Sequence, residues 1–450
     1  MNKMFSGKKT FFISAAVILL ALVFRLVPAW CALDFPERIT RPDTMTYLAP
    51  AQALLEGKFF GTGRAPGYIV LAAAARGLSL EYHTVLLALA GVLFSTLTLI
   101  PLYAGTKELF GPKAALIANL LYAFNLTAIA NAPMLLSDTF FAFFAACQYC
   151  FFARFYRKKK SADFLLCIFF AAAGTLIRPI NLPWLAPALV LLCFLPGIPW
   201  KQKAWNTLGA VTITLFILLP WMARNAASGA PWCIDTNTGA MVHQNGAMIL
   251  SEARGTSYEA EKEKIRQEYG ELFKDTEKFP DEKSQEKWKM ARLRQIIAAH
   301  PFIALKQHFN WHRILLPDAP TFFELLGVTK SDRGTMGVLA QKGLFAAVDH
   351  YFEGRWELPC LLLPLLLVTG ITYLGTVILL IWSVFHFRRR WYLGLIFLAF
   401  AEFYLFLPGP ICAPRYQLPA LPLLCGFAGI VLVFLWRMLK CRFRKNTHQS

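Results

Sequence analysis

Residues 41–68 read RPDTMTYLAPAQALLEGKFFGTGRAPGY, a polar stretch between two long apolar segments. It contains an Arg-Pro-Asp turn, a short amphipathic segment and a Gly-rich loop that ends in Arg64-Ala-Pro-Gly-Tyr68. Asp43 is the only acid among residues 41–55. We expect this insert to carry the chemistry of the protein, and the rest of the chain to hold it at a membrane surface.

The composition of the flanking chain is that of a membrane protein. Of the 450 residues, 56% are hydrophobic and 14% aromatic, and the mean hydropathy is +0.46. Several apolar runs reach the ~20 residues that a helix needs to cross a bilayer. The sequence therefore predicts an all-α polytopic membrane protein. The net charge of +19 does not indicate a nucleic-acid partner, because most basic residues lie in short loops between apolar runs.

The distribution of Lys and Arg predicts the topology. With the N-terminus inside, every short basic loop falls on the cytoplasmic side, so both termini are cytoplasmic and the insert 31–83 and the region 224–357 are extracytoplasmic. We expect the cytoplasmic (inner) membrane of a bacterial-type cell. Residues 66–78 are interpreted as an interfacial helix, because a span there would reverse every later loop. About ten spans are predicted, at 11–30, 84–104, 114–131, 137–156, 162–178, 180–196, 205–223, 358–386, 391–408 and 416–437.

Three regions follow from this topology. Residues 1–223 form an N-terminal transmembrane module with the first outer loop, residues 224–357 a mostly helical extracytoplasmic region, and residues 358–450 the C-terminal helices with a basic cytoplasmic tail. From 288 to 311, apolar and basic residues alternate at helical spacing. Such a helix lies on the membrane surface or packs on the rest of its own domain.

Ionisable residues from distant parts of the chain map to one level at the outer membrane face. The acids are Asp43 and Asp138. Charges near a bilayer are costly and usually mark function. Arginine binds phosphate oxygens in a bidentate manner, and a neighbouring carboxylate can take a proton from a hydroxyl. The pattern predicts a site for a phosphate-bearing substrate. The arginines at this level are Arg64, Arg178, Arg224 and Arg415.

Each of these residues also has a structural interpretation. Asp43 and Asp138 can cap the helices that follow them, and Arg178 and Arg415 can anchor helices at the interface. The pair Cys147 and Cys150 has the spacing of a redox or zinc motif, but it lies inside an apolar run and is interpreted as packing.

The order of these motifs resembles the family 39 membrane glycosyltransferases of the GT-C fold, which include protein O-mannosyltransferases and the bacterial aminoarabinose transferase of lipid A. The resemblance covers roughly residues 10–230 and the region near 415. The motifs that carry it are Pro42-Asp43, Arg64-Ala-Pro-Gly-Tyr68, Leu136-Ser137-Asp138, Arg178-Pro179, Leu219-Pro220-Trp221 with Arg224-Asn225, and Arg415-Tyr416.

This resemblance implies a GT-C-like bundle and an inverting glycosyltransferase. The donor would be a sugar on a polyprenyl phosphate, and the acceptor a lipid, glycan or protein of the envelope, with membrane lipids as the surrounding partner. Asp43 and Asp138 would be catalytic, with Asp43 the base or the carboxylate that orients the acceptor. The four arginines would bind the donor phosphate. The residues expected to contact substrate are Tyr47, Tyr68, Asn225 and Tyr416.

One departure from the family concerns metal binding. Relatives often carry a second acid directly after the first, and here that position is Thr44. The sequence therefore leaves a divalent metal open but does not indicate one, and no cofactor is certain.

Two other functions compete with this interpretation. A lipid or glycan transporter would place ionisable residues along a central path and often has duplicated halves, and the sequence has neither feature. A lipid-linked glycan polymerase or ligase would share the donor chemistry, and the early Asp43 motif is what favours the transferase.

Overall fold

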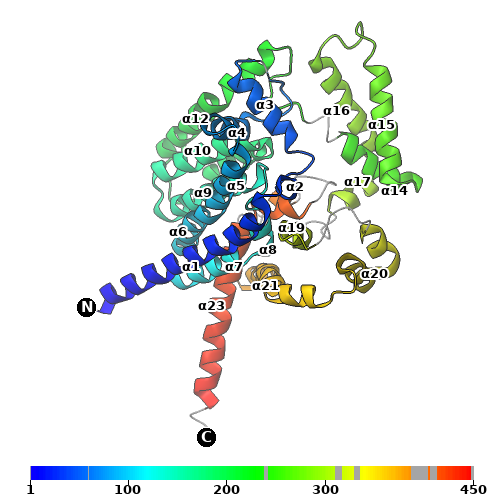
Figure 1. Cartoon of the computed structure of the whole chain (residues 1–450). Coiled ribbons are helices and arrows are strands. Elements are labelled where there is room, and N and C mark those ends of the chain that lie inside the picture. Colours follow the sequence, from blue (N-terminus) through cyan, green and yellow to red (C-terminus); the bar gives the residue numbers. More distant parts are fainter. Residues whose placement is uncertain are drawn as a thin grey trace.

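The computed structural model describes residues 2–58, 60–237, 242–309, 317–328, 335–386, 404–405 and 413–446. All the regular elements in these ranges are helices, so the predicted all-α class is confirmed. Figure 1 shows a bundle from which α1 and the end of α23 project, with α14 to α17 at its opposite side. The predicted span 391–408 lies almost wholly outside the described residues.

The first half of the chain supplies most of the bundle. Its helices are α1 (Asn2–Leu33), α2 (Pro36–Ile39), α3 (Met45–Leu55), α4 (Pro66–Leu78), α5 (His83–Leu97), α6 (Leu99–Phe110), α7 (Pro112–Ala123), α8 (Leu126–Ala130), α9 (Asp138–Lys158), α10 (Ser161–Ile177), η1 (Pro179–Trp184), α11 (Leu185–Phe194) and α12 (Trp200–Ala227).

The second half adds an outer lobe, which consists of η2 and α14 to α17, and further helices of the bundle. Its elements are η2 (Val242–Gly246), α14 (Ala247–Arg254), α15 (Tyr258–Leu272), α16 (Glu282–Ala299), α17 (Pro301–His308), α19 (Ala319–Leu325), α20 (Thr335–Phe352), α21 (Glu357–His386), η3 (Pro414–Gln417) and α23 (Leu421–Asn446).

Several helices have the length and composition of membrane spans, as a multi-pass protein requires. Among the described residues five do so, and Ser161–Ile177 and Pro179–Phe194 are shorter apolar helices. The predicted span 114–131 is divided into α7 and α8, because Asn125 caps a new helix by accepting a hydrogen bond from the amide of Ala128. The five long helices are Phe12–Leu33, His83–Phe110, Trp200–Ala227, Glu357–Leu379 and Leu421–Cys441.

A buried arginine fastens the first helix to the bundle. Arg25 of α1 is fully buried, and its Nε donates to Ser95 Oγ of α5 at 2.7 Å. Its terminal nitrogens donate to the carbonyl oxygens of Tyr122 and Ala123 in α7, each at 3.2 Å. A cation inside an apolar bundle needs such partners, since burying it unpaired is expensive.

The outer lobe has a small core of its own. Ile249, Ile265 and Ile296 are buried together there, with Leu293 packed against them. These contacts support the interpretation of α16 as a helix packed on its own domain. Phe302 of α17 is 85% exposed, so α17 still presents apolar surface.

Close packing of α4 on α10 brings two parts of the polar level together. A Cβ built on Gly67 would lie 2.6 Å from Ile177 Cδ1 and 2.8 Å from the carbonyl oxygen of Leu176. Glycine is therefore the residue that lets α4 reach the end of α10, and small residues at helix contacts serve this purpose in membranes. Arg64 precedes α4 and Arg178 follows α10, so this contact holds the two arginines at one level.

We expect Gly67→Ala to lower the free energy of unfolding by about 1–3 kcal/mol, because the added methyl group overlaps backbone atoms. Thermal unfolding in detergent measures this. Gly61→Ala is the matched control, since a Cβ at Gly61 meets nothing within 4 Å. Equal melting temperatures for the two variants would contradict the proposed role of Gly67.

Candidate active site

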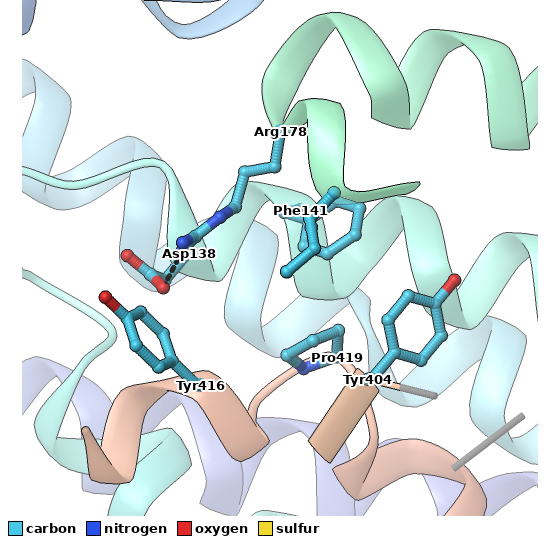
Figure 2. A pocket seen from close by; sticks show the side chains of 7 residues that line it. Asp138, Phe141, Arg178, Tyr404, Tyr416 and Pro419 are labelled. Atoms are coloured by element: carbon cyan, nitrogen blue, oxygen red, sulfur yellow. Dashed lines mark hydrogen bonds and ion pairs between the residues drawn. The ribbon is translucent and has the colours of Figure 1, made fainter. Parts of the chain in front are cut away.

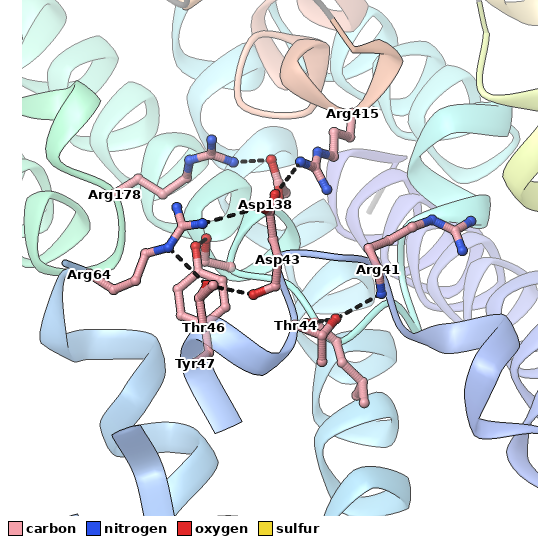
Figure 3. A network of polar contacts seen from close by, with 11 residues as sticks. Arg41, Asp43, Thr44, Thr46, Tyr47, Arg64, Asp138, Arg178 and Arg415 are labelled. Atoms are coloured by element: carbon pink, nitrogen blue, oxygen red, sulfur yellow. Dashed lines mark hydrogen bonds and ion pairs between the residues drawn. The ribbon is translucent and has the colours of Figure 1, made fainter. Parts of the chain in front are cut away.

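Asp43 joins two arginines from distant parts of the chain. It lies in the turn between α2 and α3, where its Oδ1 accepts from Arg64 at 3.2 Å and its Oδ2 from Arg415 at 2.7 Å. Figure 3 shows both guanidiniums directed at this carboxylate. No side-chain hydrogen bond caps the N-terminus of α3, so the capping interpretation of Asp43 is wrong. The Asp43 side chain is 41% exposed and stays accessible to a ligand.

Asp138 forms the second ion pair. It is the first residue of α9, and Arg178 at the end of α10 donates to its Oδ1. Asp138 is 5% exposed, and it does not cap α9. The guanidinium of Arg178 also lies over the ring of Tyr416, 5.3 Å from its centroid. The ends of α9, α10 and the segment before α23 therefore meet at this pair.

Thr44, next to Asp43, has a structural role. Its Oγ1 accepts from the amide of Arg41 at 2.9 Å and donates to the carbonyl oxygen of Leu135 at 3.1 Å. The amide of Leu135 in turn donates to the carbonyl oxygen of Ile39 at 2.9 Å. These bonds fix the turn that bears Asp43 to the segment that leads into Asp138.

An ion pair from the second half of the chain supports the same turn. Arg41 contacts Glu324 Oε2 at 2.5 Å and Thr321 Oγ1 at 3.2 Å. Both partners belong to α19, which packs against α1, α2 and α8. The turn before Asp43 is thus held on one side by α19 and on the other by Thr44.

Tyr47 and Tyr68, which are both predicted to contact substrate, differ in their contacts with the charged residues of the site. The Arg64 guanidinium lies 5.0 Å from the ring centroid of Tyr47, and the Tyr47 hydroxyl is 3.2 Å from Ser137 Oγ. Tyr68 packs edge-on against Tyr47 with its ring centroid 5.0 Å away. Tyr68 is fully buried and supports Tyr47, and its contact with substrate stays a prediction.

Arg224 and Asn225 contact a different set of residues from the carboxylates. Arg224 donates to the carbonyl oxygen of Phe60, and its guanidinium lies 4.6 Å from the ring centroids of both Phe60 and Trp221. Asn225 is fully buried and donates to the carbonyl oxygens of Cys233 and Ile234. Asn225 therefore holds the loop after α12, and the predicted substrate contact of Asn225 and the predicted phosphate contact of Arg224 stay predictions.

A narrow pocket opens beside the Asp138 ion pair (Figure 2). Tyr404 stands at its wall and donates from its hydroxyl to Asn181 Oδ1 at 2.8 Å. Tyr416, a predicted substrate contact, also lines the pocket. The lining residues are Asp138, Phe141, Arg178, Ile180, Tyr404, Tyr416 and Pro419.

The charged groups of the site shift one another's pKa values. Burial raises the pKa of Asp43, but Arg415, Arg64 and Arg178 lower it by more, so the pKa lies below its ordinary value of 3.8. Burial alone would lower the pKa of Arg415, yet neighbouring groups that include Asp138 and Asp43 raise it above the usual range. Both groups are therefore ionised throughout the physiological pH range.

The sequence patterns missed one acid at this level. Asp235 lies in the loop after α12, and burial raises its pKa to about 6 although Arg64 and Arg178 oppose the shift. The only sequence signal was an acid ten residues after Asn225 in the loop that leaves a predicted span. Within the part of the chain that the structure describes, no group of three His, Cys, Asp or Glu residues is arranged to hold a metal ion.

We expect stability to fall in acid through Asp43. A carboxyl whose pKa is lower in the folded protein stabilises the fold above its unfolded pKa, and this contribution is lost as the pH falls through the folded value. Asp43→Asn should cost at most about 1 kcal/mol at pH 7, because the pair is partly exposed. The difference in melting temperature from wild type should begin to shrink as the pH falls below about 4 and should vanish only below the folded pKa of Asp43, with the exposed Asp34→Asn as the matched control. A difference that stays constant from pH 7 to the lowest pH at which the protein is folded would refute this assignment.

Comparison with known proteins gives a partial sequence match. Residues 64–223 match the family described as dolichyl-phosphate-mannose-protein mannosyltransferase. That range contains Arg64, Asp138 and Arg178, and leaves Asp43 and Arg415 outside it. No curated protein sequence matches the chain.

Solved structures give a match over nearly the whole chain. The oligosaccharyltransferase AglB of Archaeoglobus fulgidus, in complex with an inhibitory peptide and a dolichol-phosphate, has a TM-score of 0.55 at 12% identity over 99% of this chain. The same organism's enzyme in the apo form has a TM-score of 0.54 at 14% identity over 98% of this chain. The chain spans about half the length of that enzyme, 52% in both cases. The protein therefore has the GT-C membrane fold, and its residues 64–223 match the dolichyl-phosphate-mannose-protein mannosyltransferase family.

Proposed function

We propose that the protein is an integral-membrane, inverting glycosyltransferase that takes a sugar from a polyprenyl-phosphate donor. The observation that carries the proposal is the cluster of Arg64, Arg178 and Arg415, held at one end of the bundle by Asp43 and Asp138. The family match of residues 64–223 supports it. The acceptor is a lipid, glycan or protein of the envelope, and the site faces the outer side of the cytoplasmic membrane.

The arginines bind the donor phosphate. Each guanidinium presents several donors in a planar fork that suits phosphate oxygens. The Nε–H of Arg415 is buried and has no hydrogen-bond partner among the described residues. A phosphate leaving group needs stabilisation of its charge rather than a strong acid, and fixed cations supply this. The polyprenyl tail enters from the bilayer, so a donor site at this level keeps the tail in lipid.

The carboxylates organise the site. Both oxygens of Asp43 accept from arginines, and the low pKa of Asp43 makes it a weak proton acceptor. Between the two roles that the resemblance implies for Asp43, we favour orientation of the arginines and of the acceptor. Asp138 orients Arg178. Through Arg178 it also helps to shape the pocket that Tyr416 lines.

A lipid-linked oligosaccharide is the second candidate donor, because the fold match is to an oligosaccharyltransferase. The monosaccharide donor is preferred on the family match over residues 64–223. Residues 1–223 would hold the donor, residues 224–357 would form the outer cover, and residues 358–450 would contribute Arg415. Assays with polyprenyl-phosphate mannose and with a polyprenyl-linked oligosaccharide discriminate between the two.

We expect Asp43→Asn to reduce sugar transfer by at least about 100-fold while expression and membrane insertion stay unchanged, because the variant leaves Arg64 and Arg415 without their shared anion. Transfer from a panel of radiolabelled polyprenyl-phosphate sugars by the purified protein measures this. Asp34→Asn is the matched control. Transfer by Asp43→Asn at the wild-type rate would refute the proposed site.

A second pair of variants separates phosphate binding from anchoring. Arg415→Ala should raise the KM for the donor by about 10-fold or more, since it removes a charge-assisted contact worth about 1.5–3 kcal/mol. Arg224→Ala removes an arginine that contacts Phe60 and Trp221 instead, so its effect on the donor KM should be smaller. The dependence of the initial rate on donor concentration tests both variants. A larger rise for Arg224→Ala would contradict the assignment.

A further inference from the structure

A short strap follows α12 and is pinned on both sides. We define the strap as residues 231–237. Asn225 and Trp221 of α12 donate to the carbonyl oxygen of Ile234, at 3.1 and 2.8 Å. The amide of Thr236 donates to the carbonyl oxygen of Thr62 at 3.0 Å. The strap therefore bridges α12 and the Gly-rich loop that ends at Arg64.

These bonds fix the position of Asp235. The residues on either side of it, Ile234 and Thr236, are both buried, and Ile234 packs with Ala65 next to Arg64. Asp235 is partly buried and lies near Arg64 from the Gly-rich loop, Arg178 from α10 and Glu286 from α16. The remaining polar contact is within the strap, where the backbone of Asn237 hydrogen-bonds to the carboxyl group.

This environment differs from that of the other two acids. Asp43 accepts hydrogen bonds from Arg64 and Arg415, which lower its pKa, keep it ionised and make it a weak base. Asp138 is paired with Arg178. The structure gives Asp235 no such ion pair within the described residues, and burial raises its pKa to about 6. A general base works best when its pKa lies near the working pH.

We propose that Asp235 accepts the proton of the acceptor hydroxyl, an inference that rests on the proposed glycosyl transfer. The acceptor O–H bond breaks and its proton moves to the Asp235 carboxylate. The acceptor oxygen forms a bond to the anomeric carbon, and the bond from that carbon to the phosphate oxygen breaks on the opposite side. The electron pair leaves with the polyprenyl phosphate, whose charge the arginines balance, and Asp235 then releases its proton to water.

Donor binding would strengthen this base. Arg64 and Arg178 lower the proton affinity of Asp235, and a bound phosphate offsets their charge. The proton affinity of Asp235 therefore rises when the donor is in place. Proton transfer is favoured in the complex with donor, where it serves the reaction.

The test is the pH dependence of kcat/KM for the acceptor between pH 5 and 8, measured with the full chain and a polyprenyl-phosphate sugar that the wild type accepts. We expect the wild-type value to rise with pH, with its midpoint at or above about pH 6, and to level off at higher pH, where the base is fully ionised. D235N should be about 100-fold slower or worse at pH 7 and should lack this rise. D235E should keep part of the rate together with the rise.

Two further measurements separate a chemical role from a structural one. Binding of a fluorescent polyprenyl phosphate to D235N should stay within about twofold of wild type, because the base contacts the acceptor. E286Q removes a negative neighbour of Asp235 and should move the rise in kcat/KM to lower pH. A residue that only holds the strap would show neither effect.

Each outcome decides the inference. If D235N keeps the wild-type rise with pH, Asp235 is not the proton acceptor and the proposed transferase stands. If D235N loses phosphate binding together with activity and D235E restores both without the rise, Asp235 is structural. If the wild type transfers no sugar from any donor of the panel, the proposed function falls, and the role of Asp235 with it.

Discussion

The site depends on one carboxylate that holds two arginines. Three guanidiniums at one end of a helical bundle repel one another, and burial makes each more costly. Asp43 offsets this repulsion for Arg64 and Arg415, and Asp138 does so for Arg178. The helix ends that carry these arginines can then converge. The same acids that make the cluster stable also bring the three guanidiniums together, as Figure 3 shows, so a phosphate can contact more than one of them.

Much of this arrangement could be predicted because charges are scarce in an apolar chain. The loop charges predict one topology, which stays a prediction. The two acids and three of the four arginines assigned to one level do meet in the structure. Arg224 was assigned to the same level, but the charge of a loop does not determine which residues a side chain contacts there. Tyr68 and Asn225 are buried in the structure, which their motifs do not reveal. Asp235 belongs to no motif, and its place depends on the hydrogen bond that Asn225 donates to Ile234 and the one that Thr236 donates to Thr62, which only the folded chain defines.

In two motifs, a residue with a structural role stands directly next to a charged residue of the site. Thr44 stands next to Asp43 and ties its turn to the segment before Asp138. Asn225 stands next to Arg224 and fixes the strap that bears Asp235. Loss of activity in a variant of Thr44 or Asn225 would therefore follow from displaced carboxylates. Such residues share a motif with the site because the hydrogen bonds that orient a charge must come from close by.

The separation of Asp43 and Arg415 by 372 positions in the chain has a consequence for biosynthesis. Asp43 leaves the ribosome long before its second partner exists, so the growing chain carries a half-paired carboxylate during most of translation. The cluster is complete only when the segment that bears Arg415 has been made. A chain that stops before Arg415 has every other acid and arginine of the cluster and still lacks a finished site. Synthesis of this segment is therefore the step that completes the site.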